Sequence, residues 1–412
     1  MSSKAGAALV ATDAMHEAAA VLIIGGGVIG SSVAVRLRQR MGDARIVVVE
    51  RDPTYARASS RLATGGIRQQ YDSPLNVAMA RHGVAFYARF DELCASAGHQ
   101  SRAWFRQRGY LFLADDGNAQ RVETRYATQK ASGANVERWT AARIASHMPG
   151  LVTDDIAFGV FGPEDGYLDP REVLAGFRAI ATASGVEYVH GTVVEIERNG
   201  GRVSGVRVDT LDGERTFATP VVVDAAGAGA AAVGDAAGVS LPIDPVRQHL
   251  FRLALEEPLR SRIPMTFDPD GTHWRLDDPR SPDAAECLVI GRSLAEEPAG
   301  FNFDCDYRRL EEEMLPTLAR RYPAARVESV VEGWAGLYEM TPDHNALLGE
   351  HPDLPGFIVA AGFSGHGLMM APATGLAIAE LISDGRCTTF DIAPLAVDRF
   401  ARGEPFLDGA LV

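Results

Sequence analysis

Lysine is nearly absent from this chain of 412 residues. Thirty-eight of the forty basic residues are arginine, and the two lysines are Lys4 and Lys130. Schiff-base chemistry, pyridoxal phosphate attachment and phosphate-binding loops each require a lysine amine. These enzyme classes are therefore excluded unless Lys130 supplies that amine.

Cysteine is almost as scarce, and no two cysteines stand close enough to form a CxxC pair. No histidines accompany them at the spacing of a metal site. We therefore expect no metal centre and a reducing, cytoplasmic environment. The four residues are Cys94, Cys287, Cys305 and Cys387.

Surplus positive charge is also missing, since 54 acidic residues outnumber 40 basic ones and the net charge is −14. Such a chain is poorly suited to bind nucleic-acid phosphates or anionic lipid. With 46% hydrophobic and 23% charged residues, it has the composition of a globular protein long enough for two domains. A small molecule is the expected partner.

No segment has the pattern of a membrane helix or a signal peptide. The stretch 354–379 has 26 residues without a charge, but glycines and prolines interrupt it. We predict instead a strand over 356–361, a glycine loop, and a helix from about Pro372 to Ile382. Residues 1–20 contain no long apolar run and are expected to form a disordered tail.

A dinucleotide-binding motif stands near the N-terminus. The apolar strand 21–24 precedes Gly25, Gly27 and Gly30 in a GxGxxG pattern, and a helix to about residue 41 and a strand over 45–50 follow. These glycines allow a tight turn and close approach of the backbone to a pyrophosphate. Glu50 ends the second strand, where a carboxylate can accept hydrogen bonds from a ribose diol. An acid there disfavours NADP but does not separate NAD from FAD.

The rest of the chain predicts two kinds of sheet. Strands over 185–189, 192–196 and 203–208, joined by glycine turns, indicate a β-meander that ends in a buried strand at 221–225. Further strands are expected over 249–255, 287–291 and 327–338, and a helix over 307–322 that is interrupted at Pro316. We therefore expect an α/β protein in which a second domain is inserted into the dinucleotide-binding one.

Four blocks carry a resemblance to a known family. They are VLIIGGGVIGSS with Glu50 and Arg51; ASSRLATGGIR at 58–68; Asp165 to Pro170 with the strand around Val194 and VVVDAAGAG; and GWAGLYEMTPD at 333–343 with GFSGHG at 362–367. From about Val21 to Ile382 the chain resembles the FAD-dependent amino-acid and amine oxidoreductases, which include D-amino-acid oxidase, glycine oxidase and sarcosine oxidase.

The resemblance implies a discontinuous Rossmann-like FAD-binding domain over 21–93, 146–240 and 333–412. An α+β substrate domain built on an antiparallel sheet would comprise 94–145 and 241–332. It also implies which residues bind FAD. They are Gly25, Gly27, Val28, Ile29, Gly30, Glu50, Arg51, Ser59, Ser60, Arg61, Thr64, Gly65, Gly66, Val194, Ala226, Gly227, Gly336, Gly362, Gly365, His366, Gly367 and Leu368.

The chemistry that the resemblance implies is hydride transfer from a C–H bond beside nitrogen to flavin N5, which gives an imine that water hydrolyses. Such a site positions its substrate more than it supplies an acid–base pair, so no catalytic residue is assigned. A substrate carboxylate calls for an arginine fork, and Arg68 matches that position. Tyr338 matches a substrate-site tyrosine, and Arg292 is a second candidate anion contact. His366 is the remaining polar candidate in the glycine loop.

Departures from the sarcosine oxidase pattern also matter. Met369 stands where that enzyme has a carboxylate-binding lysine. The position of the enzyme's oxygen-activating lysine corresponds to a residue near Val289 in this chain. The enzyme's flavin-linking cysteine falls at Gly336, and no histidine stands near Ser59 or Ser60 to form the bond found in other relatives. We therefore expect noncovalent FAD and slow reaction with oxygen.

The sequence thus favours an FAD-dependent dehydrogenase or weak oxidase of a secondary, N-alkylated or D-amino acid. Two alternatives stay open. One is oxidation of a 2-hydroxy acid, which uses similar carboxylate recognition, and the other is a role as a flavin-holding subunit or assembly partner of a larger complex. The electron acceptor would be oxygen or a redox partner.

Overall fold

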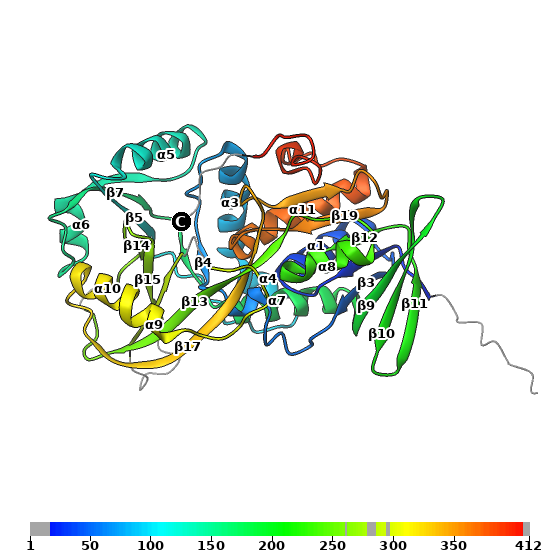
Figure 1. The fold of residues 1–412 in the computed structure, drawn as a ribbon, viewed down its shortest axis with the longest axis horizontal. Coiled ribbons are helices and arrows are strands. Elements are labelled where there is room, and N and C mark those ends of the chain that lie inside the picture. The colour runs from blue at the N-terminus through cyan, green and yellow to red at the C-terminus, as the bar shows by residue number, and fades with distance from the viewer. Residues whose placement is uncertain (1–16, 260–261, 278–285, 294–296, 407–412) are drawn as a thin grey trace, which may run out of the picture.

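The computed structural model describes residues 17–259, 262–277, 286–293 and 297–406. These residues form two large sheets, on the right and on the left of Figure 1, with helices packed on both. One sheet has a parallel centre and the other is mostly antiparallel. The expected α/β class with a second, antiparallel sheet is therefore confirmed.

The nine-stranded sheet carries the dinucleotide-binding motif. Its central five strands are parallel, and antiparallel strands extend it on both sides. Every residue of β2 is buried, as expected for a parallel strand covered on both faces. In order across the sheet the strands are β1 (Glu17–Ala18), β11 (Gly213–Ala218), β10 (Arg202–Thr210), β9 (Glu187–Asn199), β3 (Ile46–Glu50), β2 (Val21–Ile24), β12 (Val222–Asp224), β19 (Phe357–Ala361) and β18 (Leu347–Glu350).

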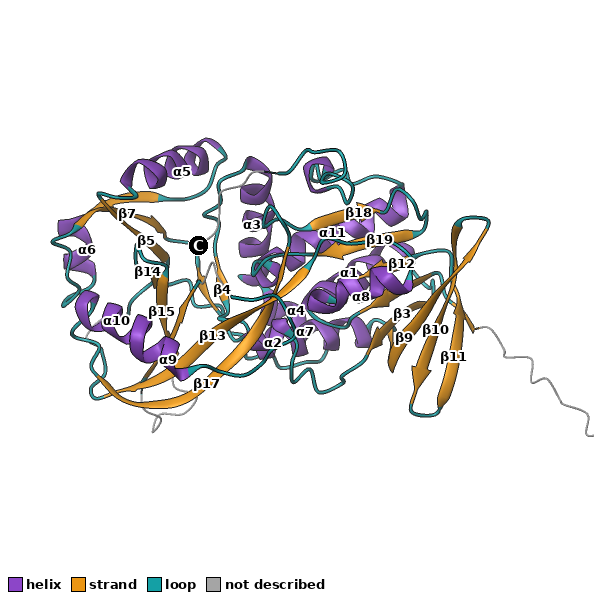
Figure 2. Cartoon of the chain, viewed as in Figure 1, coloured by secondary structure: helices purple, strands orange, loops and turns teal. Residues whose placement is uncertain are grey.

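Two long helices pack closely on one face of this sheet, namely α1 (Val28–Met41) and α11 (Gly367–Asp384). Gly375 makes their close approach possible, because a Cβ there would lie 2.3 Å from Ser32 Oγ. Figure 2 shows further helices around this sheet. They are α2 (Ser59–Leu62), α3 (Pro74–Tyr87), α4 (Phe90–Ser96), α7 (Pro170–Ala183) and α8 (Ala230–Ala236), with short 3₁₀ turns at Gly227–Gly229 and Ala393–Leu395.

The second sheet has eight strands and its own core, in which Trp139, Trp274 and Phe251 are fully buried. Its strands in order are β17 (Val327–Met340), β13 (Asp244–Leu255), β16 (Cys287–Arg292), β15 (Thr272–Asp277), β14 (Met265–Phe267), β5 (Tyr110–Asp115), β7 (Ile156–Gly162) and β6 (Glu137–Thr140). Its helices are α5 (Ala119–Ala131), α6 (Ala141–His147), α9 (Tyr307–Arg309) and α10 (Leu315–Arg321). A small ribbon of β4 (Gly66–Ile67) and β8 (Gly166–Tyr167) lies apart from both sheets.

Strand pairing shows that two segments expected in the FAD-binding domain join the second sheet. β7 pairs with β5 and β6, and β17 pairs with β13 along its whole length. Residues 156–162 and 333–340 therefore belong to the second sheet, although they were expected in the FAD-binding domain. Pairing partners decide this membership, and one sequence does not reveal them.

Four local predictions need correction. Residues 17–20 are not a tail, because β1 pairs with β11 and Glu17 forms ion pairs with Arg45 and Arg215; residues 1–16 lie outside the described part. The two strands expected at 185–196 form one strand, β9. The helix 307–322 runs through Pro316, because a π-helical turn over Leu310–Met314 precedes that proline.

The fourth correction concerns α11, which begins at Gly367 and includes Pro372. A proline inside a helix leaves the carbonyl four residues earlier without its helical donor. Here the Tyr87 hydroxyl donates to that carbonyl, Leu368 O, at 2.6 Å. A side chain from α3 thus replaces the missing bond, and the helix starts five residues before the predicted position.

Candidate functional site

A cavity of about 180 Å³ lies between the parallel sheet and the second sheet. Its walls come from the turn after β2 (25–29), the end of β3 (50–52), the segment 55–64, residues 225–228 after β12, residues 336–339 of β17 and the loop 365–368. The second sheet closes it with Gln248, His249, Leu250, His273 and Arg292. Most of the sequence blocks singled out above therefore meet at one place.

The glycine turn at one end of the cavity is built to bring backbone close to a ligand. Gly25 has φ 99°, and a Cβ on it would lie 2.4 Å from Ala225 O. A Cβ on Gly30 would lie 1.9 Å from Gly25 O, so this glycine serves the packing beneath the turn. The turn leads into α1, whose N-terminal N–H groups favour a negatively charged ligand.

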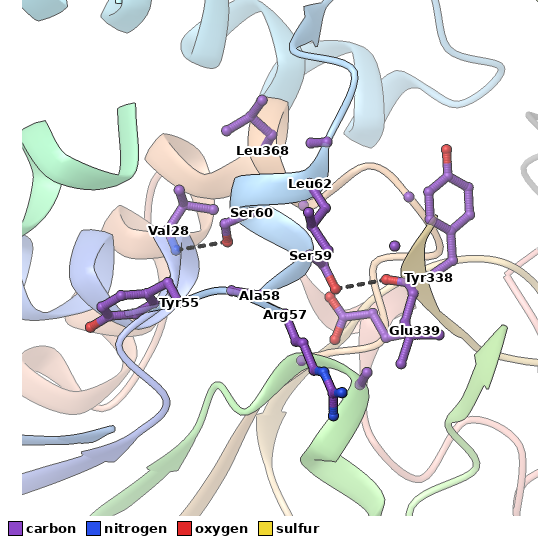
Figure 3. Close-up of a pocket in the computed structure, with 18 of the residues that line it drawn as sticks. Val28, Tyr55, Arg57, Ala58, Ser59, Ser60, Leu62, Tyr338, Glu339 and Leu368 are labelled. Carbon is purple, nitrogen blue, oxygen red and sulfur yellow. Dashed lines mark hydrogen bonds between the residues drawn. The ribbon is translucent and has the colours of Figure 1, made fainter. Parts of the chain in front are cut away.

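Glu50 is fixed beside this turn at the end of β3. Its Oε2 accepts a hydrogen bond from Gly26 N and its Oε1 one from Asp52 N, both at 2.8 Å. Val28 N donates to Ser60 Oγ at 3.1 Å, and Ser59 Oγ donates to Leu337 O at 2.7 Å. The short helix α2 is thus tied to both the glycine turn and β17, as Figure 3 shows.

At the other end of the cavity Tyr338 packs on Gly365, where a Cβ would lie 2.5 Å from the tyrosine ring. Arg68 is 2% exposed, and its guanidinium lies 4.3 Å from the centroid of the Tyr71 ring. Arg68 Nη2 lies 3.2 Å from His366 Nε2, and Arg68 Nη1 donates to Gln70 O. Burial raises the pKa of Tyr338, and the Arg68 charge opposes that rise.

Aromatic rings form a wall beside Arg68, whose guanidinium lies 5.4 Å from the centroid of the Phe112 ring. The Phe112 and Phe267 rings stack with centroids 4.7 Å apart, and His273 stacks on Phe267 at 4.6 Å. The Tyr110 ring lies 5.4 Å from Phe267, and a Cβ on Gly66 would lie 2.3 Å from the Tyr110 hydroxyl. Burial lowers the pKa of His273 to about 4, so this imidazole is neutral near pH 7.

Comparison with known proteins shows what this arrangement is. Residues 20–381 match the family described as FAD dependent oxidoreductase. The chain belongs to this family. Because the match covers the residues of all the cavity walls, the protein is an FAD-dependent oxidoreductase, and the cavity is its candidate FAD site.

Three relatives illustrate the similarity. FAD-dependent oxidoreductase domain-containing protein 1 from Xenopus laevis is 33% identical, over 97% of this chain and 86% of that protein. Glycine oxidase from Geobacillus kaustophilus is 28% identical, over 92% and 96%. The crystal structure of L-proline dehydrogenase from P. horikoshii superposes with a TM-score of 0.83 at 28% identity, covering 95% of this chain and all of that one.

The cavity fits FAD on its own features. Gly25 and Gly27 leave room for a pyrophosphate at the start of α1, and Glu50 stands where a ribose would lie. The residues predicted to bind FAD that line the cavity are Gly25, Gly27, Val28, Ile29, Glu50, Arg51, Ser59, Ser60, Thr64, Ala226, Gly227, Gly336, Gly365, Gly367 and Leu368. Two predicted substrate residues, Tyr338 and Arg292, line it as well.

Other predicted residues lie behind the cavity wall. Gly65 and Gly66 pack on Leu168 and Tyr110, and Gly362 N donates to Glu339 Oε2 at 3.0 Å. Met369 is buried and its sulfur accepts a hydrogen bond from the Tyr71 hydroxyl. These residues support the site without lining it.

Arg61, Arg68 and Val194 are placed elsewhere. Arg61 lines a second cavity, and Arg68 lines a third one together with Phe112. Val194 is 43% exposed and does not line the FAD cavity. It is the unpaired residue of a bulge in β9, because Glu195 pairs with Arg207 and Val193 with Val208. The bulge turns its side chain to solvent.

Several lining residues had no signal in the sequence. Gln248, His249 and His273 reach the cavity from β13 and β15. Glu339 also lines it beside Tyr338; it stands in the block 333–343, but the resemblance assigned it no role. Single polar residues on strands carry no motif, so only the pairing of the second sheet could reveal them. Among the described residues no cluster could hold a metal ion, and no helix is long and apolar enough to cross a membrane.

Proposed function

We propose that this protein oxidises the C–N bond of a secondary, N-alkylated or D-amino acid, giving an imine that hydrolyses in water. The observation that carries the proposal is the buried Arg68, held beside His366 close to Tyr338 and the aromatic wall. The Arg68 charge also lowers the pKa of Tyr110, against the rise that burial causes. One cation among buried rings suits a carboxylate joined to an alkylated amine.

In this mechanism the chain binds and orients. The chemistry that FAD would supply when bound is acceptance of a hydride from the carbon beside nitrogen. Arg68 would hold the substrate carboxylate through its planar fork while His366 holds the fork in place. Tyr338, Tyr110 and the Phe112 and Phe267 rings would enclose the amine and exclude water. The neutral amine supplies its own electron pair, so no general base is assigned.

Relatives support an amino-acid substrate. They include glycine oxidase, at 28% identity, and L-proline dehydrogenase, which is named for a secondary amine. A human sarcosine dehydrogenase is also 28% identical, although the matched region covers 40% of it.

The low basicity of the buried imidazoles disfavours a 2-hydroxy acid as substrate. Oxidation of an alcohol requires removal of the hydroxyl proton by a general base within hydrogen-bond reach, most often an imidazole. The imidazoles nearest the aromatic wall are poor bases, since burial holds the pKa of His273 at about 4 and that of His366 at about 3. An amine substrate needs no such base.

We also propose noncovalent FAD. All four cysteines are free and none lines the FAD cavity. Free thiols also fit the proposed cytoplasmic location. Acid precipitation of the purified protein should release all of its flavin into solution.

For the electron acceptor we propose a redox partner rather than oxygen, because no lysine lines the cavity. A second cavity of about 230 Å³ lies behind the segment 62–64. Trp334 Nε1 donates to Leu62 O at 2.9 Å and Arg275 Nε to Thr64 O at 2.7 Å, so one stretch of backbone separates the two cavities. Arg61, Arg102 and Arg171 also line this second cavity. It would suit a negatively charged acceptor.

Anaerobic mixing of the purified protein with a panel of amino acids tests the proposed function. The panel comprises glycine, sarcosine, L-proline, D-alanine and N-methylated amino acids, with lactate and 2-hydroxyglutarate as the alcohol arm. Bleaching of the flavin absorbance by amines alone is expected. Bleaching by the hydroxy acids, or by no amine, would overturn the proposal.

A further inference from the structure

A buried carboxyl group faces the FAD cavity without a cation beside it. Glu339 on β17 is 8% exposed and lines the cavity. Its Oε2 accepts a hydrogen bond from Gly362 N at 3.0 Å, and Phe363 N also donates to the carboxyl. None of the ion pairs found among the described residues involves Glu339. Backbone N–H groups are thus its partners.

The carboxyl lies between two glycines of the FAD site. A Cβ on Gly227 would lie 3.8 Å from Glu339 Oε2, and one on Gly367 would lie 3.8 Å from Oε1. Both glycines line the cavity, and Gly367 is the first residue of α11, a helix of 18 residues. The positive end of this helix favours negative charge within its first turn. The positive end of α11 would therefore stabilise negative charge both on Glu339 and on reduced FAD in the cavity.

A second buried carboxyl lies near Glu339. Asp224 at the end of β12 is fully buried; its Oδ1 accepts from Ala226 N at 3.1 Å, and its Oδ2 has no hydrogen-bond partner. Burial raises the pKa of both groups, that of Glu339 to about 7, and the charge of Glu339 adds to the rise at Asp224. Neighbouring buried carboxyls resist ionising together.

The other charged groups on the cavity wall are engaged elsewhere. Arg57 lies over the Phe303 ring at 5.0 Å, and Arg292 lies 3.6 Å from Glu313. Glu50 and Asp52 stand at the glycine-turn end of the cavity, whereas Arg51 lies against the turn Gly227–Gly229, its Nη1 3.7 Å from the position of a Cβ on Gly229. In the loop before α11, His366 contacts Arg68. Asp224, at the end of β12 in the other sheet, is the carboxyl group on which the Glu339 charge acts.

We propose that Glu339 is the proton acceptor coupled to reduction of FAD. Two electrons and one proton enter as the substrate hydride, which leaves one additional negative charge in the cavity. A proton from solvent then adds to the Glu339 carboxylate and offsets that charge. Reoxidation removes the two electrons together with the proton that came with the hydride, and the Glu339 proton returns to solvent. Above about pH 7 the oxidised protein has an ionised Glu339 that can take up this proton, whereas well below pH 7 the group already carries it.

The test uses the FAD-loaded protein and needs no substrate, so it can fail independently of the proposed function. The holoprotein is photoreduced anaerobically in weak buffer with a pH indicator, and protons bound per two electrons are counted at pH 6 and pH 8. At pH 8 the wild type should bind up to one proton more than Glu339→Gln, and at pH 6 the two should agree. The control Glu332→Gln, an exposed position on the same strand, should behave as the wild type. Equal counts for wild type and Glu339→Gln at pH 8 would overturn the proposal.

A second measurement covers the case in which Glu339→Gln does not hold FAD. The reduced-minus-oxidised infrared spectrum of the wild type at pH 8 should gain the carbonyl band of a protonated carboxyl group. The band should persist in Asp224→Asn and be absent from the wild-type difference spectrum at pH 6. A wild type without this band at pH 8, or loss of the band in Asp224→Asn, would assign the proton elsewhere.

Discussion

Arg68 Nη2 lies 3.2 Å from His366 Nε2, which joins the segment after β4 to the loop before α11 across 298 positions of sequence. A guanidinium can only donate, so His366 Nε2 is the acceptor and the imidazole is neutral. Burial and the Arg68 charge lower the pKa of His366 to about 3, which agrees with this assignment. His366 therefore acts as a positioning residue for Arg68 rather than as a base.

Arg68→Leu should raise KM for the amino-acid substrate by about 10- to 100-fold, because a charge-assisted hydrogen bond contributes about 1.5–3 kcal/mol. FAD should stay bound, since Arg68 does not line the FAD cavity. Steady-state kinetics and flavin absorbance measure both quantities. Arg292→Leu is the matched comparison, because Arg292 lines the cavity and lies beside Glu313. If Arg292→Leu alone raised KM, the carboxylate contact would belong to Arg292.

His366 should make stability depend on pH. Its folded-state pKa of about 3 lies below the ordinary value of 6.5, so the unfolded chain binds more protons between these values. The free energy of unfolding should therefore fall by about 2 kcal/mol between pH 6.5 and pH 5 from this group alone. In His366→Gln the fall should be smaller by that amount in urea titrations, whereas the exposed His190→Gln should keep the wild-type dependence. An unchanged slope in His366→Gln would contradict a buried, neutral imidazole.

The sequence predicted which segments meet at the glycine-turn end of the cavity, for a physical reason. The turn after β2, Glu50 and the segment around Ser59 and Ser60 are adjacent in sequence to the strand or helix that places them, so their spacing carries geometry. The loop 362–367 was found in the same way. Pro372 misplaced the start of α11, because the hydroxyl that compensates for it comes from Tyr87 on another helix.

The second sheet was harder to predict because pairing fixes it. β5 and β14 are parallel neighbours from distant parts of the chain, and together they bring Tyr110 beside Phe267. His273 reaches the cavity because β15 pairs with β16 in one register. A one-residue slip would turn it away. The bulge that exposes Val194 depends on β10 in the same way.

Glu50→Ala should weaken FAD binding by about tenfold, because a carboxylate that accepts hydrogen bonds from ribose hydroxyls contributes about 1–2 kcal/mol. Fluorescence titration of the apoprotein with FAD measures the change. Val194→Asp serves as the comparison: its exposed position predicts an unchanged affinity. A loss in Val194→Asp equal to that in Glu50→Ala would mean that the cofactor reaches β9.

Arg321→Met should destabilise the protein by about 3–5 kcal/mol, because it removes the buried partner of the Asp268 carboxylate and leaves only the half-exposed Arg320 beside it. Arg321 Nε lies 2.6 Å from Asp268 Oδ2, and both side chains are 1% exposed. The neighbouring Arg320 pairs with Asp155 and Asp268 as well, but its side chain is 50% exposed. Arg320→Met should therefore cost less than about 1 kcal/mol. Chemical denaturation measures the free energy of unfolding of both variants. Equal losses of stability would contradict the prediction that the buried ion pair matters more than the exposed one.

Reduced FAD should react slowly with oxygen and faster with an anionic dye such as dichlorophenolindophenol. No lysine lines the FAD cavity, whereas Arg61 and Arg171 line the cavity behind the segment 62–64. Among the described residues no carboxylate pairs with either guanidinium, so both remain able to attract an anion.

Arg61→Gln and Arg171→Gln should lower the reoxidation rate with the anionic dye several-fold and leave the rate with cationic ferrocenium unchanged. Added salt should reduce the wild-type rate with the dye, because screening weakens the attraction. The surface variant Arg138→Gln, whose arginine pairs with Glu123, controls for net charge. Equal rates with both dyes in all variants would place the exit of electrons elsewhere on the protein.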